Sequence, residues 1–163
     1  MRTIEITEIN DSVVFKNIYG IFQTWDRIKK YSYLTTPRPN HGFIYLDTDV
    51  VITTPMGDEK KYTRGTILYL PKGAFYQASF PFGENIHTLL VNFEMCLDTG
   101  EDVAFTNNIT KLVSDASAKY TDEFHKIINS FKTIENNHFI IKSAFNSLCA
   151  EICSHLERRE KNS

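Results

Sequence analysis

Apolar and polar residues alternate through most of the first hundred residues, and turn-forming residues interrupt this pattern at short intervals. A period of two is typical of β-strands with one buried face, and several short strands at this spacing favour a sandwich or a barrel. The interruptions carry glycine, proline and aspartate, which supply the backbone conformations that tight turns need. We expect strands in the segments SVVFKNIYGIF, KYSYL, GFIYL, VVITT, KKY, TILYL, AFYQASF and HTLLVNF.

The periodicity changes to a helical one from about residue 120 onward. Apolar residues then recur at intervals of three or four, which predicts an amphipathic helix with Thr121 as its N-cap. A second helix follows the interruption ENN and ends near Arg158 and Arg159, whose charges suit a helix C-terminus. The apolar residues that define the two helices are Phe124, Ile127, Ile128, Phe131 and Ile134 in the first and Ile141, Phe145, Leu148, Ile152 and Leu156 in the second.

These two patterns divide the chain into a β domain over residues 1–105 and a linker with a helical hairpin over residues 106–163. The second helix carries more apolar surface than one contact requires, and monomeric proteins rarely expose a contiguous apolar patch of more than a few hundred Å². We therefore expect a symmetric homodimer formed chiefly through this helix. The alternative is that both sides of the helix pack within the subunit. The expected dimer residues are Ile141, Phe145, Leu148, Ile152 and Leu156.

Composition and charge exclude several functions. The 163 residues carry a formal net charge of −2 and contain no run of basic residues interleaved with aromatic ones, so the chain by itself is not expected to bind DNA. Three cysteines form no disulfide framework, the opening MRTIEITEIN does not resemble a signal peptide, and no apolar run approaches the roughly 20 residues of a membrane span. We expect a cytoplasmic protein without a membrane partner.

The segment GTILYLPKGAFYQ places Gly65, Pro71, Gly73 and Tyr76 at the spacing of the second conserved motif of the cupins, which it resembles. Cupins are small double-stranded β-helix barrels, and the last position of this motif is normally a metal-binding histidine. Tyr76 occupies that position, and the first cupin motif is matched by His41 alone, without a second histidine two residues on. One histidine and one phenol are poor ligands for a divalent metal. We expect neither a metal nor another cofactor.

The wider order of features resembles the N-terminal effector-binding and dimerisation domain of AraC-family transcription regulators. Arg38 and His41 are followed by an apolar strand, the 65–77 segment, the strand HTLLVNFEM and two helices. The resemblance implies a mainly β fold, with a cupin-like double-stranded β-helix barrel followed by a C-terminal α-helical hairpin. It also implies a non-enzymatic domain that binds a small-molecule effector, such as a sugar. The helix-turn-helix module of the family has no counterpart before Ser163, so DNA would be bound only through a C-terminal module absent from this chain.

The candidate effector contacts combine a polar group with apolar surface or, for arginine, offer a fork of donors. Each could also be a core or rim residue, and an error of one residue in strand register would exchange it for its neighbour. A second class of function stays open, namely a small metal-independent cupin enzyme, such as a sugar isomerase, that works through Tyr76, His41 or Arg38. The candidate effector contacts are Arg38, His41, Tyr45, Tyr69 and Tyr76.

Overall fold

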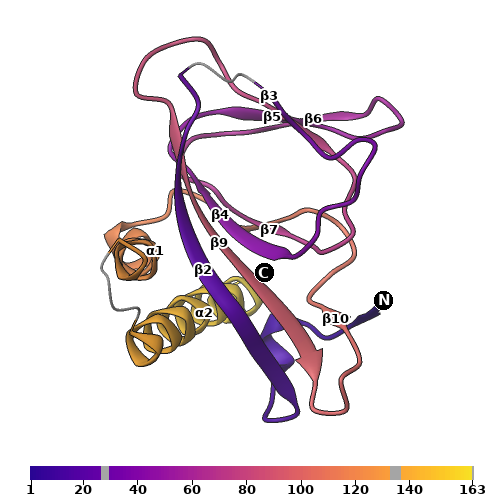
Figure 1. Cartoon of the computed structure of the whole chain (residues 1–163), viewed down its shortest axis with the longest axis vertical. Helices are drawn as coiled ribbons and strands as arrows, with labels where there is room; N and C mark the ends of the chain where they lie inside the picture. Colours follow the sequence, from indigo (N-terminus) through magenta and orange to yellow (C-terminus); the bar gives the residue numbers. More distant parts are fainter. Residues whose placement is uncertain (27–29, 133–136, 163) are drawn as a thin grey trace.

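Two antiparallel sheets lie face to face, and two helices cover the outer face of the larger sheet (Figure 1). The structure is a computed structural model that describes residues 1–26, 30–132 and 137–162. The expected mainly β fold with a C-terminal pair of helices is confirmed. The elements are β1 (Arg2–Thr3), η1 (Ile6–Glu8), β2 (Val13–Thr24), β3 (Lys30–Ser32), β4 (His41–Leu46), β5 (Val50–Thr53), β6 (Glu59–Tyr62), β7 (Ile67–Leu70), β8 (Gln77–Ser79), β9 (His87–Leu97), β10 (Val103–Ala104), β11 (Thr110–Val113), α1 (Ala118–Ser130) and α2 (His138–Lys161).

The chain crosses repeatedly between the two sheets. The larger sheet has the strand order β11-β7-β4-β9-β2 and the smaller one the order β3-β8-β5-β6. The connections β4 to β5, β6 to β7, β7 to β8 and β8 to β9 therefore each lead from one sheet to the other. Such crossings are common in all-β folds built from two sheets. They place residues that are far apart in sequence on the two sides of one interior space.

The larger sheet is buried on both faces. In its central strand β4, Ile44 and Leu46 belong to the apolar core between the sheets, whereas Phe43 belongs to the core beneath the helices. Successive side chains of a strand point to opposite faces, so β4, β7 and β9 each contribute to both cores. This explains why β4, β7 and β9 appear in the sequence as nearly continuous apolar runs.

Helix α1 begins three residues before the expected N-cap. Ser117 is the N-cap residue, and Thr121 lies inside the helix, where its hydroxyl donates to the carbonyl of Ala118. The side chain of Ser117 makes no capping hydrogen bond. Tyr120 is 3% exposed and packs in the core, so tertiary packing stabilises the first turn of the helix instead. Helix α2 has Asn137 as its N-cap, and this side chain accepts hydrogen bonds from two backbone N–H groups of the first turn. Ile134, assigned above to the first helix, lies outside the described residues.

The expected boundary at residue 105 falls before the last strand of the larger sheet. Strand β11 lies inside the stretch that the sequence suggested as a linker, and it pairs with β7 through Thr110 opposite Tyr69. The helices share one apolar core with this sheet. Residues 110–113 therefore belong to the sheet, and the helices form part of the same packed unit.

The apolar stripe of α2 is absorbed within the subunit, as the alternative interpretation anticipated. Ile141, Phe145, Leu148 and Ile152 are at most 6% exposed, and Leu156 is half-buried against the same core. Side chains buried this deeply cannot also form a dimer interface in the folded chain. The dimer contacts assigned to Ile141, Phe145, Leu148 and Ile152 must therefore be revised, because helical periodicity identifies a buried face without identifying what covers it. Leu156 is partly accessible, and its contact with a partner stays a prediction. Dimer formation itself stays a prediction.

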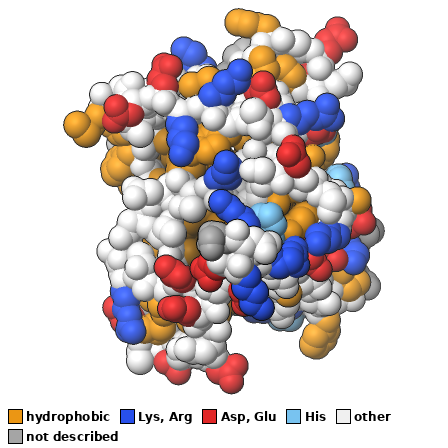
Figure 2. All heavy atoms as spheres, turned by 180° about the vertical axis from the view of Figure 1, so that it is seen from behind, with side chains coloured by type: hydrophobic (Ala, Val, Ile, Leu, Met, Phe, Trp, Pro, Cys, Tyr) orange, Lys and Arg blue, Asp and Glu red, His pale blue; other side chains and the backbone are white. Residues whose placement is uncertain are grey.

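The surface mixes all classes of side chain. Figure 2 shows the face opposite to that of Figure 1, where basic, acidic and apolar side chains are interspersed. Neither of the two described helices combines the length and the apolar character needed to cross a membrane.

Gly20 is the point where α1 packs directly on β2. A Cβ atom at this position would lie 2.8 Å from Cγ1 and 2.9 Å from the backbone nitrogen of Ile128. We expect Gly20→Ala to lower the free energy of unfolding by about 1–3 kcal/mol, because the helix must move away from the sheet. Urea unfolding measures this loss. Lys16→Ala, at an exposed position of the same strand, is the control and should change stability little. Equal stability of Gly20→Ala and the wild type would contradict the packing.

Candidate functional site

A cavity lies between the two sheets and has a volume of about 140 Å³. Its walls come from β2, β4, β7 and β9 of the larger sheet, from β5 and β8 of the smaller one, and from the segment between β3 and β4. An apolar cavity of roughly 150 Å³ holds a molecule the size of benzene. The aliphatic part of the wall includes Ile44, Leu46, Val50, Ile52, Leu68 and Leu70.

One end of the cavity is polar and centres on Arg38. This side chain is 3% exposed, and its Nη2 donates to Oδ1 of Asn92. Its Nη1 lies 3.4 Å from the hydroxyl of Tyr76, and the guanidinium carbon lies 5.8 Å from the ring centroid of Tyr33. Asn92 in turn donates to the hydroxyl of Tyr19 at 3.0 Å, which fixes its amide with the oxygen toward Arg38. The three side chains around the guanidinium group, those of Asn92, Tyr76 and Tyr33, carry no acidic group. Tyr19, the partner of Asn92, carries none either.

The turn Pro71-Lys72-Gly73, which lies within the cupin-like segment of the sequence, positions this polar end. Gly73 adopts a φ of 88°, which favours glycine, and its N–H donates to the carbonyl of Arg38 at 2.8 Å. The N–H of Arg38 donates to the carbonyl of Ala74 at 2.9 Å. The turn thus carries Tyr76 into the cavity on one side and holds the backbone of Arg38 on the other. A single local motif brings the two residues together.

Gly42 leaves the space that the guanidinium occupies. A Cβ atom on this residue of β4 would lie 2.5 Å from Nη2 of Arg38 and 3.0 Å from Oδ1 of Asn92. The arginine can therefore lie flat over the central strand only because residue 42 has no side chain. The sequence reading had placed this glycine only as the start of an apolar strand.

Aromatic side chains surround the rest of the cavity. The rings of Tyr33 and Tyr76 lie 5.5 Å apart, and at the other end Trp25 stacks on Phe80 at 4.2 Å. The indole N–H of Trp25 donates to Thr88 at 2.9 Å, so its polar edge is satisfied. Burial raises the pKa of Tyr76, an effect that the charge of Arg38 opposes. The hydroxyl of Tyr76 is therefore neutral and can donate a hydrogen bond at neutral pH.

Three of the five expected effector contacts lie on the wrong face of the larger sheet. His41 and Tyr45 share the helix-facing side of β4 with Phe43, and Tyr69 occupies the same side of β7. Nδ1 of His41 lies 2.8 Å from the hydroxyl of Tyr69, and the ring of Tyr45 faces Phe124 of α1. The assignment of His41, Tyr45 and Tyr69 to the cavity is corrected, since both faces of these strands are apolar and the sequence could not distinguish them.

Arg38 and Tyr76 do line the cavity, and contact of either with an effector stays a prediction. Sequence reasoning missed Asn92, which holds the guanidinium group. A signal was present, because Asn92 is a polar residue in the middle of the apolar strand HTLLVNFEM, and buried polar residues need a partner. Tyr33 and Tyr19 carried no comparable signal, since they lie in segments of mixed polarity, where a tyrosine does not stand out.

His41 is a neutral, structural histidine. Burial lowers its pKa to about 4, and the nearby charge of Lys72 lowers it further in the same direction. Nδ1 accepts a hydrogen bond from the backbone N–H of Lys72 at 3.1 Å. Within the described parts of the chain, no group of three or more histidine, cysteine, aspartate or glutamate side chains is arranged to hold a metal ion.

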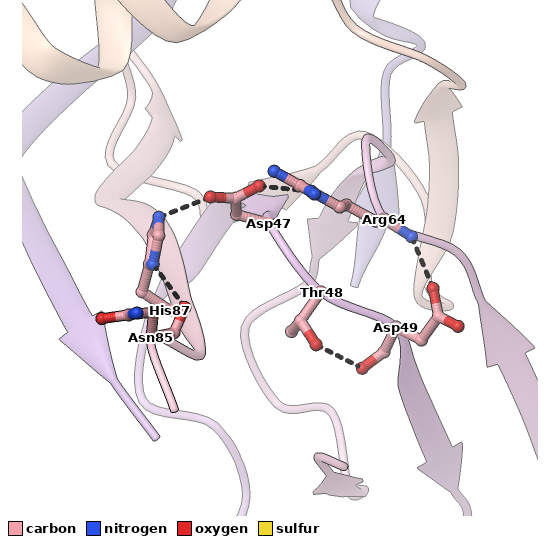
Figure 3. A network of polar contacts seen from close by, with 6 residues as sticks. All are labelled: Asp47, Thr48, Asp49, Arg64, Asn85 and His87. Atoms are coloured by element: carbon pink, nitrogen blue, oxygen red, sulfur yellow. Dashed lines mark hydrogen bonds and ion pairs between the residues drawn. The ribbon is translucent and has the colours of Figure 1, made fainter. Parts of the chain in front are cut away.

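A polar network pins the corner where the chain passes from β4 to β5 (Figure 3). Asp47 accepts from Nε of Arg64 at 2.7 Å and pairs with Nε2 of His87 at 2.5 Å. Asp49 accepts from the backbone N–H of Arg64 at 2.9 Å. An outer groove of this region includes the network and meets the wall of the cavity at Val50 and Phe80. The network therefore holds together the end of the cavity that is opposite Arg38.

Fold and site together define a two-sheet β domain with a small interior cavity that has one charged end. No family model and no curated protein matches the sequence. The solved structures that resemble the chain include two of ToxT from Vibrio cholerae, an AraC-family regulator. The AraC resemblance predicted from the sequence names the same family.

The first ToxT structure is 14% identical, covers 50% of this chain and 30% of its own, and has a TM-score of 0.34. The second, a variant of ToxT without ligand, is 8% identical, covers 94% of this chain and 57% of its own, and has a TM-score of 0.45. The chain therefore spans less than two thirds of either ToxT chain. At these TM-scores the likeness assigns no function.

Proposed function

We propose that this chain is the effector-sensing domain of an AraC-type transcription regulator, which binds a small molecule between its two sheets. One observation carries the proposal, namely an interior cavity of ligand size with a buried guanidinium group at one end. Pockets for small molecules are typically apolar with a few well-placed polar groups. The order of a two-sheet domain followed by two helices supports the same proposal.

In the proposed mechanism, binding changes how the two sheets lie on each other, and the change reaches the helices through one layer of side chains. Strand β4 lines the cavity with Ile44 on one face and packs Phe43 against Phe145 of α2 at 6.0 Å on the other. A ligand shifts such an equilibrium only if it binds one arrangement better. The readout would be a DNA-binding module joined C-terminally to this domain, in a homodimer whose contacts lie outside the buried stripe of α2.

The enzyme alternative loses one of its three candidate groups. Such an enzyme would work through Tyr76, His41 or Arg38, and His41 lies on the same face of β4 as Phe43, away from the cavity. His41 is also completely buried and separated from the cavity by the sheet itself. The remaining pair, Arg38 and Tyr76, suits binding of a ligand, because burial raises the pKa of Tyr76 and disfavours the phenolate that a base would need.

Ala78→Phe is expected to fill the cavity and abolish ligand binding while the chain stays folded. Ala78 lines the cavity from β8 and is buried, so a larger side chain would extend into the empty space. A ligand at 100 times its dissociation constant should add about 2.7 kcal/mol to the wild type, or roughly 5–10 °C in Tm for a chain of this size. The measurement is a thermal-shift screen of small metabolites on both proteins.

Ala150→Phe is the matched control, because Ala150 is exposed on α2 and remote from the cavity. Compounds that stabilise the wild type should stabilise this control equally and leave Ala78→Phe unaffected. If no compound shifts the wild type, or if the shifts persist in Ala78→Phe, the cavity is not the binding site and the proposal fails.

A further inference from the structure

The buried guanidinium of Arg38 lacks a counter-charge. None of the ion pairs among the described residues involves Arg38, and its Nε has no hydrogen-bond partner there. Arginine stays charged in proteins and offers five N–H donors, of which the neutral groups Asn92 and Tyr76 take only part. Buried charges are normally paired, since removing an ion from water is costly. The cavity is therefore built around a positive charge that the described part of the chain leaves unmatched.

The cavity constrains the anion that could match it. Arg38 is the only charged residue among the described residues that line the cavity, so the site supplies one positive charge. A phosphate group carries about −1.5 to −2 at pH 7 and would bring excess negative charge into the cavity. A carboxylate carries one charge and matches the planar fork of a guanidinium in two parallel hydrogen bonds.

The rest of the wall constrains the body of the ligand. The wall formed by the aliphatic side chains of β4, β5 and β7 offers no hydrogen-bond partners, so hydroxyls on that side of a sugar would be desolvated without compensation. The amide and hydroxyl groups of the lining come from other parts of the wall, namely Tyr19, Gln23, Tyr31, Tyr33, Asn40, Tyr76 and Asn92. The volume of about 140 Å³ accommodates a group the size of one six-membered ring.

We infer that the ligand of this cavity is a small monocarboxylate with a compact apolar body, whose carboxylate pairs with Arg38. The hydroxyl of Tyr76, which lies beside the guanidinium, is placed to donate to the second carboxylate oxygen. This inference rests on the proposed function and names the class of ligand for the same cavity. It replaces the sugar that the family resemblance suggested.

The test compares acids with their own amides on the unmodified protein by isothermal titration calorimetry at pH 7 and constant ionic strength. The probes are benzoate, phenylacetate, cyclohexanecarboxylate and hexanoate, each beside the corresponding amide. At least one acid should bind about tenfold or more tightly than its amide, because a charge-assisted pair replaces a neutral one. No variant is needed for this comparison, so misfolding cannot obscure it.

Two variants locate the effect at Arg38. Arg38→Met should weaken binding of that acid by about 30-fold or more and leave its amide nearly unaffected. Gly42→Ala keeps the arginine but places a Cβ atom 2.5 Å from Nη2, so it should displace the guanidinium and weaken the acid selectively. Arg64→Met is the control, since that side chain is 71% exposed on the surface and should leave the ratio unchanged.

Each outcome of these experiments either supports or overturns the inference. An acid that binds no better than its amide in all four pairs, or an acid preference that survives Arg38→Met, overturns the inference. If the amides bind and Ala78→Phe abolishes this binding, the cavity remains a ligand site for neutral molecules and the proposed function stands. If none of the eight compounds nor any member of the metabolite screen binds, the proposed function falls as well.

Discussion

Phe145→Ala is expected to lower the free energy of unfolding by about 3–5 kcal/mol, the usual cost of removing a fully buried aromatic side chain. Phe145 is 0% exposed, and its ring lies 5.2 Å from Phe15 and 5.0 Å from Phe93. This ring joins α2 to three strands of the larger sheet. The loss is a large share of the 5–15 kcal/mol that stabilises a typical domain, so the variant should be close to unfolding at 37 °C.

Urea unfolding at 25 °C measures the loss, and Asn146→Ala is the matched control. Asn146 is the next residue of α2 and points to solvent, so its replacement should change stability by less than about 0.5 kcal/mol. Sedimentation of the wild type should accompany the experiment. If α2 belonged to a dimer seam, the loss in Phe145→Ala would depend on protein concentration, whereas a core residue gives the same loss at every concentration. A concentration-dependent loss, or no loss, would contradict the position of α2 in the structure.

The helices and strands were largely predictable because their periodicities differ. Alternation identified the strands, and the three-four spacing identified both helices, although the N-cap of α1 was placed at Thr121, four residues after Ser117. What periodicity cannot supply is the partner of each apolar face. The stripe of α2 is apolar enough for a dimer seam, yet the subunit's own core buries four of its five residues and part of the fifth, Leu156. That face was invisible in the sequence, since β4 and β9 are apolar on both sides.

The sequence also left open which face of each strand lines the cavity, and this limited the prediction of the candidate site. Tyr69 and Leu70 are adjacent in β7, and the structure turns the leucine toward the cavity and the tyrosine toward the helices. Arg38 was found because an arginine beside a proline turn is conspicuous, and Tyr76 because a motif fixed its direction. Asn92 was missed, although a lone amide in an apolar strand is the kind of residue that holds a buried charge.

Acidification from pH 7 to pH 4 is expected to cost the chain about 3 kcal/mol through His41 alone. In the unfolded chain this histidine takes up a proton below its ordinary pKa of 6.5, whereas burial lowers the pKa in the folded chain to about 4. Between these values the unfolded state binds more protons, so stability falls as the pH falls. The contribution is complete above pH 6.5 and lost progressively through the window down to about pH 4. A difference of about 2.5 pKa units corresponds to about 3 kcal/mol.

His41→Asn removes the titrating imidazole. The side-chain oxygen of the asparagine can still accept the hydrogen bond that the backbone N–H of Lys72 donates to His41 in the wild type. The variant should be less stable than the wild type at pH 7, since the amide replaces a well-packed ring. Its stability should nevertheless fall less steeply between pH 6.5 and 4, by about the amount that His41 contributes. His125→Asn is the control, because His125 is exposed on α1 and its replacement should leave the pH profile as it is in the wild type.

Urea unfolding at half-unit pH steps gives the three profiles. Parallel profiles for the wild type and His41→Asn would mean that His41 is accessible to protons in the folded chain. The face of β4 that carries it would then not be sealed by the helices.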